Sequence, residues 1–393
     1  MIDLIIKLKK NKEIMNKRNS NDITIIALVI FEFINTMFRA FGMVNINQSI
    51  ILREFDFIIL LVLMIKHFIS QKKIDITILK YIVLYLYIVF ISSIYGISNI
   101  TEFSNIIMPL VLGLLGCTVY FSLDDKRLRA IIYIGVWIML FLYYSFVITG
   151  SYAHDPTGIN SIYYFLLSFP LILCFPKSLL KLITVILITI VVVISMKSTA
   201  LIILISVLLI EYYYHMKDSS LKRIIMPFFI LLFFVIAIFM IKRFLNIDVV
   251  EMYVKSNILD GGNGRTEIWK NVINMFKNSN IVQMIFGHGY NAVANITGLS
   301  AHNDYLELLF DFGILGFCGF ISTIFYWIKS YFKMKKLEFK YSKLFLMVIC
   351  ELLIIFFFSS CYFQASYYLM IVFILFSLIN NYKVTKRKVL SNE

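Results

Sequence analysis

The sequence predicts an all-α, polytopic membrane protein with about twelve transmembrane helices and one large extracytoplasmic loop between the ninth and tenth. Hydrophobic residues make up 60% of the 393 residues, and the mean hydropathy is +0.86. Charged residues make up only 15%, too few to cover the apolar surface of a water-soluble protein. Apolar runs of about 16 to 26 residues recur along the chain, and runs of this length are typical of membrane-spanning helices.

Each predicted span is long enough, at ~1.5 Å per residue, to cross a hydrocarbon core of ~30 Å, with tilt or burial for the shorter ones. The twelve spans are residues 23–43, 55–70, 76–95, 103–121, 128–149, 160–176, 178–194, 199–214, 224–244, 303–328, 344–359 and 362–381. We find no internal repeat of the kind that marks inverted-repeat transporters.

Lysine and arginine are concentrated in alternate loops and at both ends of the chain. The basic clusters lie before residue 22 and at 66–73, 126–129, 177–181, 217–223, 329–343 and 383–388, whereas the opposite short loops hold only Arg39, Arg53 and Lys197. Cytoplasmic loops carry such an excess, so both termini are predicted to lie in the cytoplasm and the protein in the cytoplasmic membrane. The first span follows a basic segment without a cleavage site, which favours its retention.

The predicted organisation follows from these spans. It comprises a cytoplasmic N-terminus (1–22), transmembrane helices one to nine (23–244), the extracytoplasmic loop (245–301), helices ten to twelve (302–381) and a cytoplasmic tail (382–393). The formal net charge of +14 alone suggests an acidic partner. Most of that charge sets topology, however, and the loop is close to neutral, so we expect membrane lipid and no nucleic acid as partners.

Residues 266–277 of the loop have the apolar period of an amphipathic helix. The apolar stripe contains Ile268, Trp269, Val272, Ile273 and Phe276. A helix of this kind is expected to lie on the membrane surface or on other helices. The sequence Gly287-His288-Gly289 then predicts a turn that redirects the chain toward the tenth span.

Three basic residues on the outer side could act on an anionic substrate. Arg265 begins the loop helix, where a guanidinium beside free backbone N–H groups suits phosphate or pyrophosphate, although an arginine at this interface could equally meet lipid headgroups. His302 begins the tenth span and could act as a general base, or belong to a capping cluster with Asn303 or Asp304. Lys197 lies in the outer turn 195–198, where a lysine extending to the interface is the ordinary interpretation.

Other polar residues are less distinctive. Glu32 and Glu351 fall near the middle of predicted spans, where ionisable groups are costly and therefore candidates for function; Arg39 lies two turns from Glu32. The five histidines show neither HxxxH nor HExxH spacing, so no metal and no cofactor are expected.

The polar loop and the start of the tenth span resemble the O-antigen ligase and Wzy polymerase superfamily. The matching elements, in order over about 55 residues, are Gly264-Arg265-Thr266-Glu267-Ile268-Trp269, Phe286-Gly287-His288-Gly289, His302-Asn303-Asp304-Tyr305-Leu306 and Asp311-Phe312-Gly313-Ile314-Leu315-Gly316. The resemblance implies an enzyme that transfers glycans from a polyprenyl-diphosphate carrier on the outer face of the membrane, without a metal.

The resemblance also implies roles for individual residues. Arg265 would bind the diphosphate, and His302 would activate the acceptor hydroxyl or steady the leaving group. The family has a Ser-Arg motif where this chain has Met196-Lys197-Ser198, so Lys197 would supply a point charge without the bidentate fork of an arginine. Weaker candidates for the site are Asn303, Trp269, His288, Arg39, Arg53 and Glu32.

The resemblance therefore favours a glycan polymerase that would join lipid-linked oligosaccharide repeats by inverting displacement. Its expected partners are the polyprenyl-diphosphate-linked oligosaccharide and a chain-length regulator and flippase of the same pathway. A ligase that moves a finished glycan onto lipid A core or protein shares these motifs and differs in its acceptor. A flippase or transporter for the lipid-linked repeat fits the number of spans but would not need Arg265 and His302 in a large loop.

Overall fold

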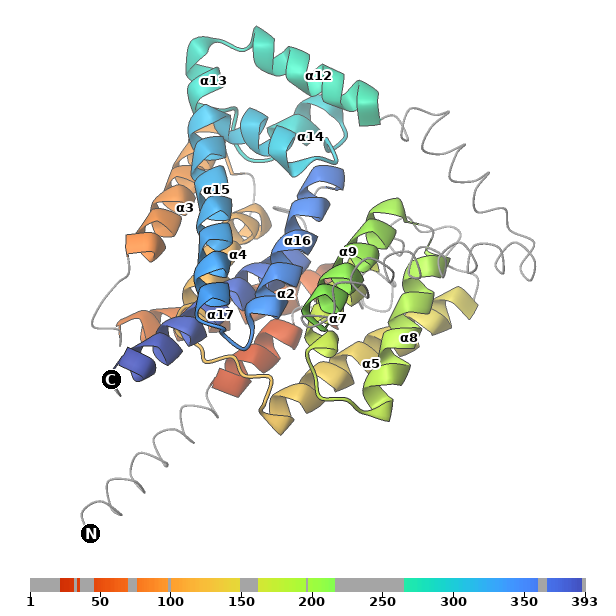
Figure 1. Cartoon of the computed structure of the whole chain (residues 1–393). Helices are drawn as coiled ribbons and strands as arrows, with labels where there is room; N and C mark the ends of the chain where they lie inside the picture. The colour runs from red at the N-terminus through yellow and green to blue at the C-terminus, as the bar shows by residue number, and fades with distance from the viewer. Residues whose placement is uncertain are drawn as a thin grey trace. The chain divides into compact units, whose positions relative to one another are not determined.

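The computed structural model describes residues 22–31, 34–35, 46–69, 76–97, 100–148, 162–195, 197–215, 265–359 and 366–390. All regular secondary structure in these ranges is helical, as the sequence predicts (Figure 1). Five of the described helices are long and apolar enough to cross a membrane, namely Ile78–Tyr95, Lys126–Ser145, Ser198–His215, Asp304–Lys336 and Tyr368–Lys386. The described part of the chain is thus all-α, and its long apolar helices are those of a polytopic membrane protein. The predicted ninth span, residues 224–244, lies outside the described residues.

The chain divides into two compact units. The first comprises Met1–Leu79, Ile107–Lys181 and Ser366–Glu393, and the second comprises Lys80–Ile106 and Leu182–Ala365. The first unit contains α2 (Ile46–Ile69), most of α4 (Ile100–Gly116), α5 (Lys126–Ile148), α7 (Ile162–Leu173) and α17 (Ser366–Leu390). All residues of α7 are buried, and this helix packs against α5 and α17.

The link between α4 and α5 is fixed by amide side chains of α17. Asn380 donates to the carbonyl oxygen of Val119 at 3.0 Å, and Asn381 accepts from the N–H of Phe121 at 3.2 Å. Asn381 also donates to the carbonyl oxygen of Phe121. These bonds satisfy backbone groups that a non-helical segment would otherwise leave unpaired within an apolar unit.

The second unit contains the loop and the predicted site residues Lys197, Arg265 and His302. Its helices are most of α3 (Ile76–Tyr95), most of α8 (Leu179–Ile194), α9 (Ser198–His215), α12 (Arg265–Asn278), α13 (Ile281–Phe286), α14 (Ala292–Thr297), α15 (Asp304–Lys336) and α16 (Ser342–Phe358). Helix α16 packs against both α9 and α15. The three short helices α12, α13 and α14 gather at the N-terminal end of α15 (Figure 1).

The structure confirms some predicted boundaries and changes others. Helix α12 covers the predicted amphipathic segment 266–277, and α8 and α9 leave the predicted short turn between them. Helix α15, predicted over 303–328, continues to Lys336 and is interrupted at Gly313, whose φ is 63° and ψ is −171°. Helix α2 begins at Ile46, although its span was predicted from residue 55. Hydropathy marks only the apolar part of a helix, whereas α2 and α15 each continue into segments that contain polar residues.

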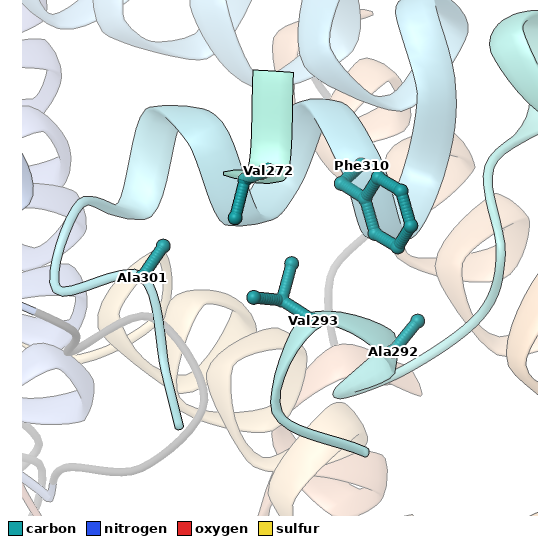
Figure 2. Packing of buried hydrophobic residues seen from close by; sticks show 5 residues of the cluster. All are labelled: Val272, Ala292, Val293, Ala301 and Phe310. Carbon is teal, nitrogen blue, oxygen red and sulfur yellow. The ribbon is translucent and has the colours of Figure 1, made fainter. Parts of the chain in front are cut away.

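The loop module, which we define as residues 265–312, has its own small core. This core is formed by Val272 of α12, by Ala292 and Val293 of α14, by Ala301, which precedes α15, and by Phe310 of α15. Ile268, Met275, Phe276 and Leu306 pack at its edge. Figure 2 shows the five buried side chains gathered between these elements. Ile273, predicted on the apolar stripe, is 40% exposed, and Met275 packs against the core. The core attaches α12 to the start of α15, so it sets where Arg265 and His302 lie.

Candidate functional site

Two glycine motifs meet backbone to backbone at one end of the loop module. A Cβ atom on Gly287 would lie within 3.0 Å of the Asp311 carbonyl oxygen, and one on Gly313 within 3.0 Å of the Ile285 carbonyl oxygen. Both glycines also have positive φ, 90° and 63°. The N–H groups of His288 and Gly289 donate to the Asp311 carbonyl at 3.0 and 2.8 Å. Only glycine allows this approach without strain, which explains why glycine occupies both positions.

Two residues that the sequence did not single out hold this junction. The Tyr87 hydroxyl of α3 lies 3.0 Å from the Phe286 carbonyl oxygen and 2.9 Å from that of Phe312. The buried carboxylate of Asp311 accepts from the Val293 N–H at 3.1 Å, at the start of α14. Asp311 lay within the family motif, but no signal in the sequence connected Tyr87 with residues more than 190 positions away.

His288, a weaker candidate from the sequence, is built into the same junction. Its Nδ1 lies 3.1 Å from the Phe310 carbonyl oxygen, and its Nε2 lies 3.1 Å from the Ser279 hydroxyl. Its ring stacks on the Phe310 ring at 4.1 Å between centroids. With both ring nitrogens engaged, His288 holds the loop in place and is not available to a substrate in this arrangement.

Arg265 lies at the start of α12 and is half-buried. Its Nη1 donates to the carbonyl oxygen of Phe358, the last residue of α16, at 3.0 Å. That bond satisfies a helix-terminal carbonyl and ties α12 to α16. A guanidinium has five N–H donors, and the other donors of Arg265 have no hydrogen-bond partner in the described part of the chain. They are the groups that could bind an anion.

His302 occupies a turn whose flanking residues are both fixed. Its own φ is 51°, in the left-handed region that residues with a side chain rarely adopt. On one side, the Trp269 Nε1 donates to the Ala301 carbonyl oxygen at 2.8 Å, and the Ala301 N–H donates to the Glu307 carboxylate at 2.6 Å. On the other side, the Asn303 side chain accepts from the Leu306 N–H and caps α15. Asn303 is the capping residue, so His302 is not needed for that role.

The charges of Lys197, Arg265 and His302 act on one another, so the fold brings these three residues together. We call them the basic cluster. Burial, followed by the nearby Arg265 charge, lowers the pKa of Lys197 from 10.5 to about 7. Burial and then the charges of Arg265 and Lys197 lower the pKa of His302 below its ordinary value. His302 is therefore a neutral imidazole near pH 7, able to accept a proton, beside cations that favour an anion.

The other predicted candidates lie elsewhere. Glu32 and Arg39 fall outside the described residues. Arg53 is half-buried in α2 of the first unit. Glu351 is fully buried in α16, and within the described residues its carboxyl oxygens have no hydrogen-bond partner. No group of three or more potential metal ligands occurs among the described residues.

One comparison with known proteins found a match, and it covers the part of the chain that contains the basic cluster. Residues 183–321 match the family described as O-Antigen ligase. None of the curated proteins matches the chain. The matched residues include all three members of the basic cluster and the whole loop module. Residues 183–321 are therefore similar to the O-Antigen ligase family, and the resemblance of this chain to the O-antigen ligase and Wzy polymerase superfamily, inferred from its motifs, is confirmed.

Proposed function

We propose that this protein is a glycosyltransferase that joins polyprenyl-diphosphate-linked oligosaccharide repeats on the outer face of the cytoplasmic membrane. The observation that carries the proposal is the convergence of Lys197, Arg265 and His302 within the matched domain. Members of this family are glycosyltransferase-like enzymes of polysaccharide assembly that act on lipid-linked glycans. A cluster of cations beside a neutral imidazole suits transfer from a diphosphate to a hydroxyl group.

The proposed reaction is a displacement at the anomeric carbon of the donor. The acceptor hydroxyl oxygen forms the new glycosidic bond while the bond between the anomeric carbon and the diphosphate oxygen breaks. His302 takes the hydroxyl proton, and the electron pair of the broken bond leaves on the polyprenyl diphosphate. The attack comes from the face opposite the leaving group, so the configuration at the anomeric carbon is inverted in the product. His302 contributes as general base, typically worth about 100- to 10,000-fold in rate.

Arg265 and Lys197 would stabilise the charge that builds up on the leaving diphosphate. A diphosphate is already a good leaving group, so positioning and charge neutralisation account for most of the catalysis. The guanidinium N–H groups of Arg265 can form a bidentate contact with phosphate oxygens. Lys197 would regain its full charge when the diphosphate binds, because an adjacent anion raises the pKa of an amine.

The proposed topology has twelve spans, both termini in the cytoplasm and residues 245–301 on the outer side. It is supported by the lysine and arginine distribution and by the apolar helices. An Asn274→Cys variant tests it, because Asn274 is exposed on α12. Labelling by a membrane-impermeant maleimide in spheroplasts is expected. Labelling only after lysis would contradict the topology.

A ligase is the second candidate, because the matched family is described as O-Antigen ligase. Both enzymes would use the same basic cluster and the same donor, and they differ in the acceptor. Purified protein incubated with a lipid-linked repeat distinguishes them. A polymerase gives a ladder of products on a gel, whereas a ligase needs an added acceptor and gives one transferred block. Absence of any transfer with either acceptor would contradict both proposals.

A further inference from the structure

Trp269 and Glu307 contact the two sides of one peptide group next to His302. The Trp269 indole donates to the Ala301 carbonyl oxygen, and Glu307 accepts from the Ala301 N–H. Ala301 itself is fully buried in the core of the loop module. A carboxylate that accepts from a backbone N–H makes a charge-assisted hydrogen bond, stronger than a neutral one. The residue before His302 therefore has little freedom to rotate.

These contacts matter because His302 is held in a left-handed conformation, with φ at 51°. Such a conformation costs a residue with a side chain of the order of 1 kcal/mol or more, and it persists only where the surroundings hold it. On the other side of His302, Asn303 is held in place because its side chain caps α15. Without the contacts to Ala301, the chain before His302 could relax to a conformation that points the imidazole elsewhere.

Trp269 also links Arg265 to the turn that contains His302. It lies four residues after Arg265 on α12, so the two side chains emerge on the same face, one turn apart. The indole ring packs edge-on against Phe357, next to the Phe358 carbonyl that accepts from Arg265. One helix thus carries the guanidinium and the side chain that fixes the His302 turn.

We infer that Trp269 and Glu307 are positioning residues, which hold the Ala301 peptide so that His302 stays beside Arg265 and Lys197. This inference rests on the proposed role of His302 as general base. Neither residue needs to touch substrate. Loss of either contact should lower turnover at saturating donor by about 10- to 100-fold, as expected when a catalytic group is displaced by about an ångström. The KM for the lipid-linked donor should change less than about twofold, since Arg265 and Lys197 remain.

The test compares three variants with one control, all in the full-length protein in nanodiscs. Trp269→Phe removes the indole donor but keeps an aromatic ring against Phe357, and Glu307→Ala removes the acceptor. Glu307→Gln keeps an oxygen that can accept from Ala301 and should retain most activity. The control, Thr297→Val, removes hydroxyl hydrogen bonds to Val293 and Leu299 in the same module without affecting Ala301.

The decisive measurement is the titration of His302 by NMR of ¹⁵N-histidine-labelled protein, with the resonance assigned from its absence in His302→Gln. Burial and then the neighbouring cations depress the pKa of His302, so displacement of the imidazole out of this buried position and away from the cations should raise that pKa in Trp269→Phe and Glu307→Ala. The pKa should be unchanged in Thr297→Val and Glu307→Gln.

The outcomes separate this inference from the proposed function. If turnover falls in the two variants while the His302 pKa stays that of the wild type, the residues only stabilise the fold and the inference is wrong. It is equally wrong if neither quantity changes. If the pKa rises as expected but His302→Ala retains full activity, the positioning stands and the catalytic role of His302 fails.

Discussion

The turns at 287–289 and 301–303 each contain a histidine within a family motif, but they use it differently. His288 has both ring nitrogens engaged and its ring stacked on Phe310. His302 has no such bonds within the described residues, and burial and then two neighbouring cations lower its pKa. In the first turn the glycines take the positive φ values, whereas in the second the histidine itself is in the left-handed conformation. His288 thus has the satisfied hydrogen bonds of a histidine that completes the fold, whereas His302, the proposed general base, is held through its neighbours, and no described residue forms a hydrogen bond with its ring.

The largest expected effect separates the two histidines. His302→Ala should lower transfer by about 100- to 10,000-fold, because a positioned general base is lost, without lowering the amount of protein in the membrane. His288→Ala should instead lower the free energy of unfolding by about 1–3 kcal/mol, the usual range for loss of buried contacts. Product on a gel and the melting temperature in detergent measure the two effects.

His302→Gln sharpens the same comparison. If His302 moves a proton, Gln should be as inactive as Ala; if it only donates a hydrogen bond to the diphosphate, Gln should restore part of the activity. Wild-type product from His302→Ala would leave the residue without a catalytic role.

Arg265 should show the next largest effect. Arg265→Ala and Arg265→Lys should both lower turnover by about 100- to 1,000-fold, the range seen when one preorganised donor to developing charge is removed. Lysine retains the charge but cannot make a bidentate contact with phosphate oxygens or reproduce the fork that reaches the Phe358 carbonyl. A nearly fully active lysine variant, measured by the same transfer assay, would reduce Arg265 to a contact with lipid headgroups.

The glycine turn predicts a smaller effect, on stability alone. Gly287→Ala would place a Cβ atom against the backbone of Asp311 at a φ of 90°, so we expect a loss of about 2–3 kcal/mol. Gly298→Ala is the control, because Gly298 has a similar φ of 76° but no atom within 4 Å of a built Cβ; it should cost about 1 kcal/mol. Equal melting temperatures for the two variants would show that the packing of the turn is not important.

Lys197 should make donor affinity depend on pH. Its pKa is lowered to about 7 in the free protein, and an adjacent diphosphate raises the pKa again. Binding therefore takes up a proton above pH 7, and donor affinity should fall by up to about tenfold per pH unit as the pH rises from 7. Lys197→Arg stays charged, so its KM for the donor should be flatter with pH. A KM in the wild type that does not change between pH 7 and 9 would contradict this.

The smallest expected effect is that of removing divalent ions. Since the charge on the diphosphate would be neutralised by Arg265 and Lys197, EDTA should change the rate of transfer by less than about twofold. If EDTA abolishes transfer and magnesium or manganese restores it, charge neutralisation by the basic cluster is not sufficient.

The helical fold, the position of α12 and the three basic residues could be predicted from local patterns in the sequence. Apolar runs predicted the helical membrane fold, and the 3.6-residue period predicted α12 almost to the residue. Lys197, Arg265 and His302 were identified because basic side chains stand out at helix ends in an apolar chain. Helix formation and hydrophobicity depend on residues close in sequence, so one chain is enough to show them.

The tertiary structure decided which of these residues share a site and what holds them there. It placed Trp269 and Glu307 on the two sides of Ala301, Tyr87 against carbonyl groups up to 225 positions away, and the backbone of Gly287 against that of Asp311. It also gave the ring of His288 two hydrogen-bond partners and, among the described residues, gave the ring of His302 none. These outcomes depend on contacts between segments that are distant in sequence. Such contacts produce no periodic pattern in one sequence, so they could not be predicted from it.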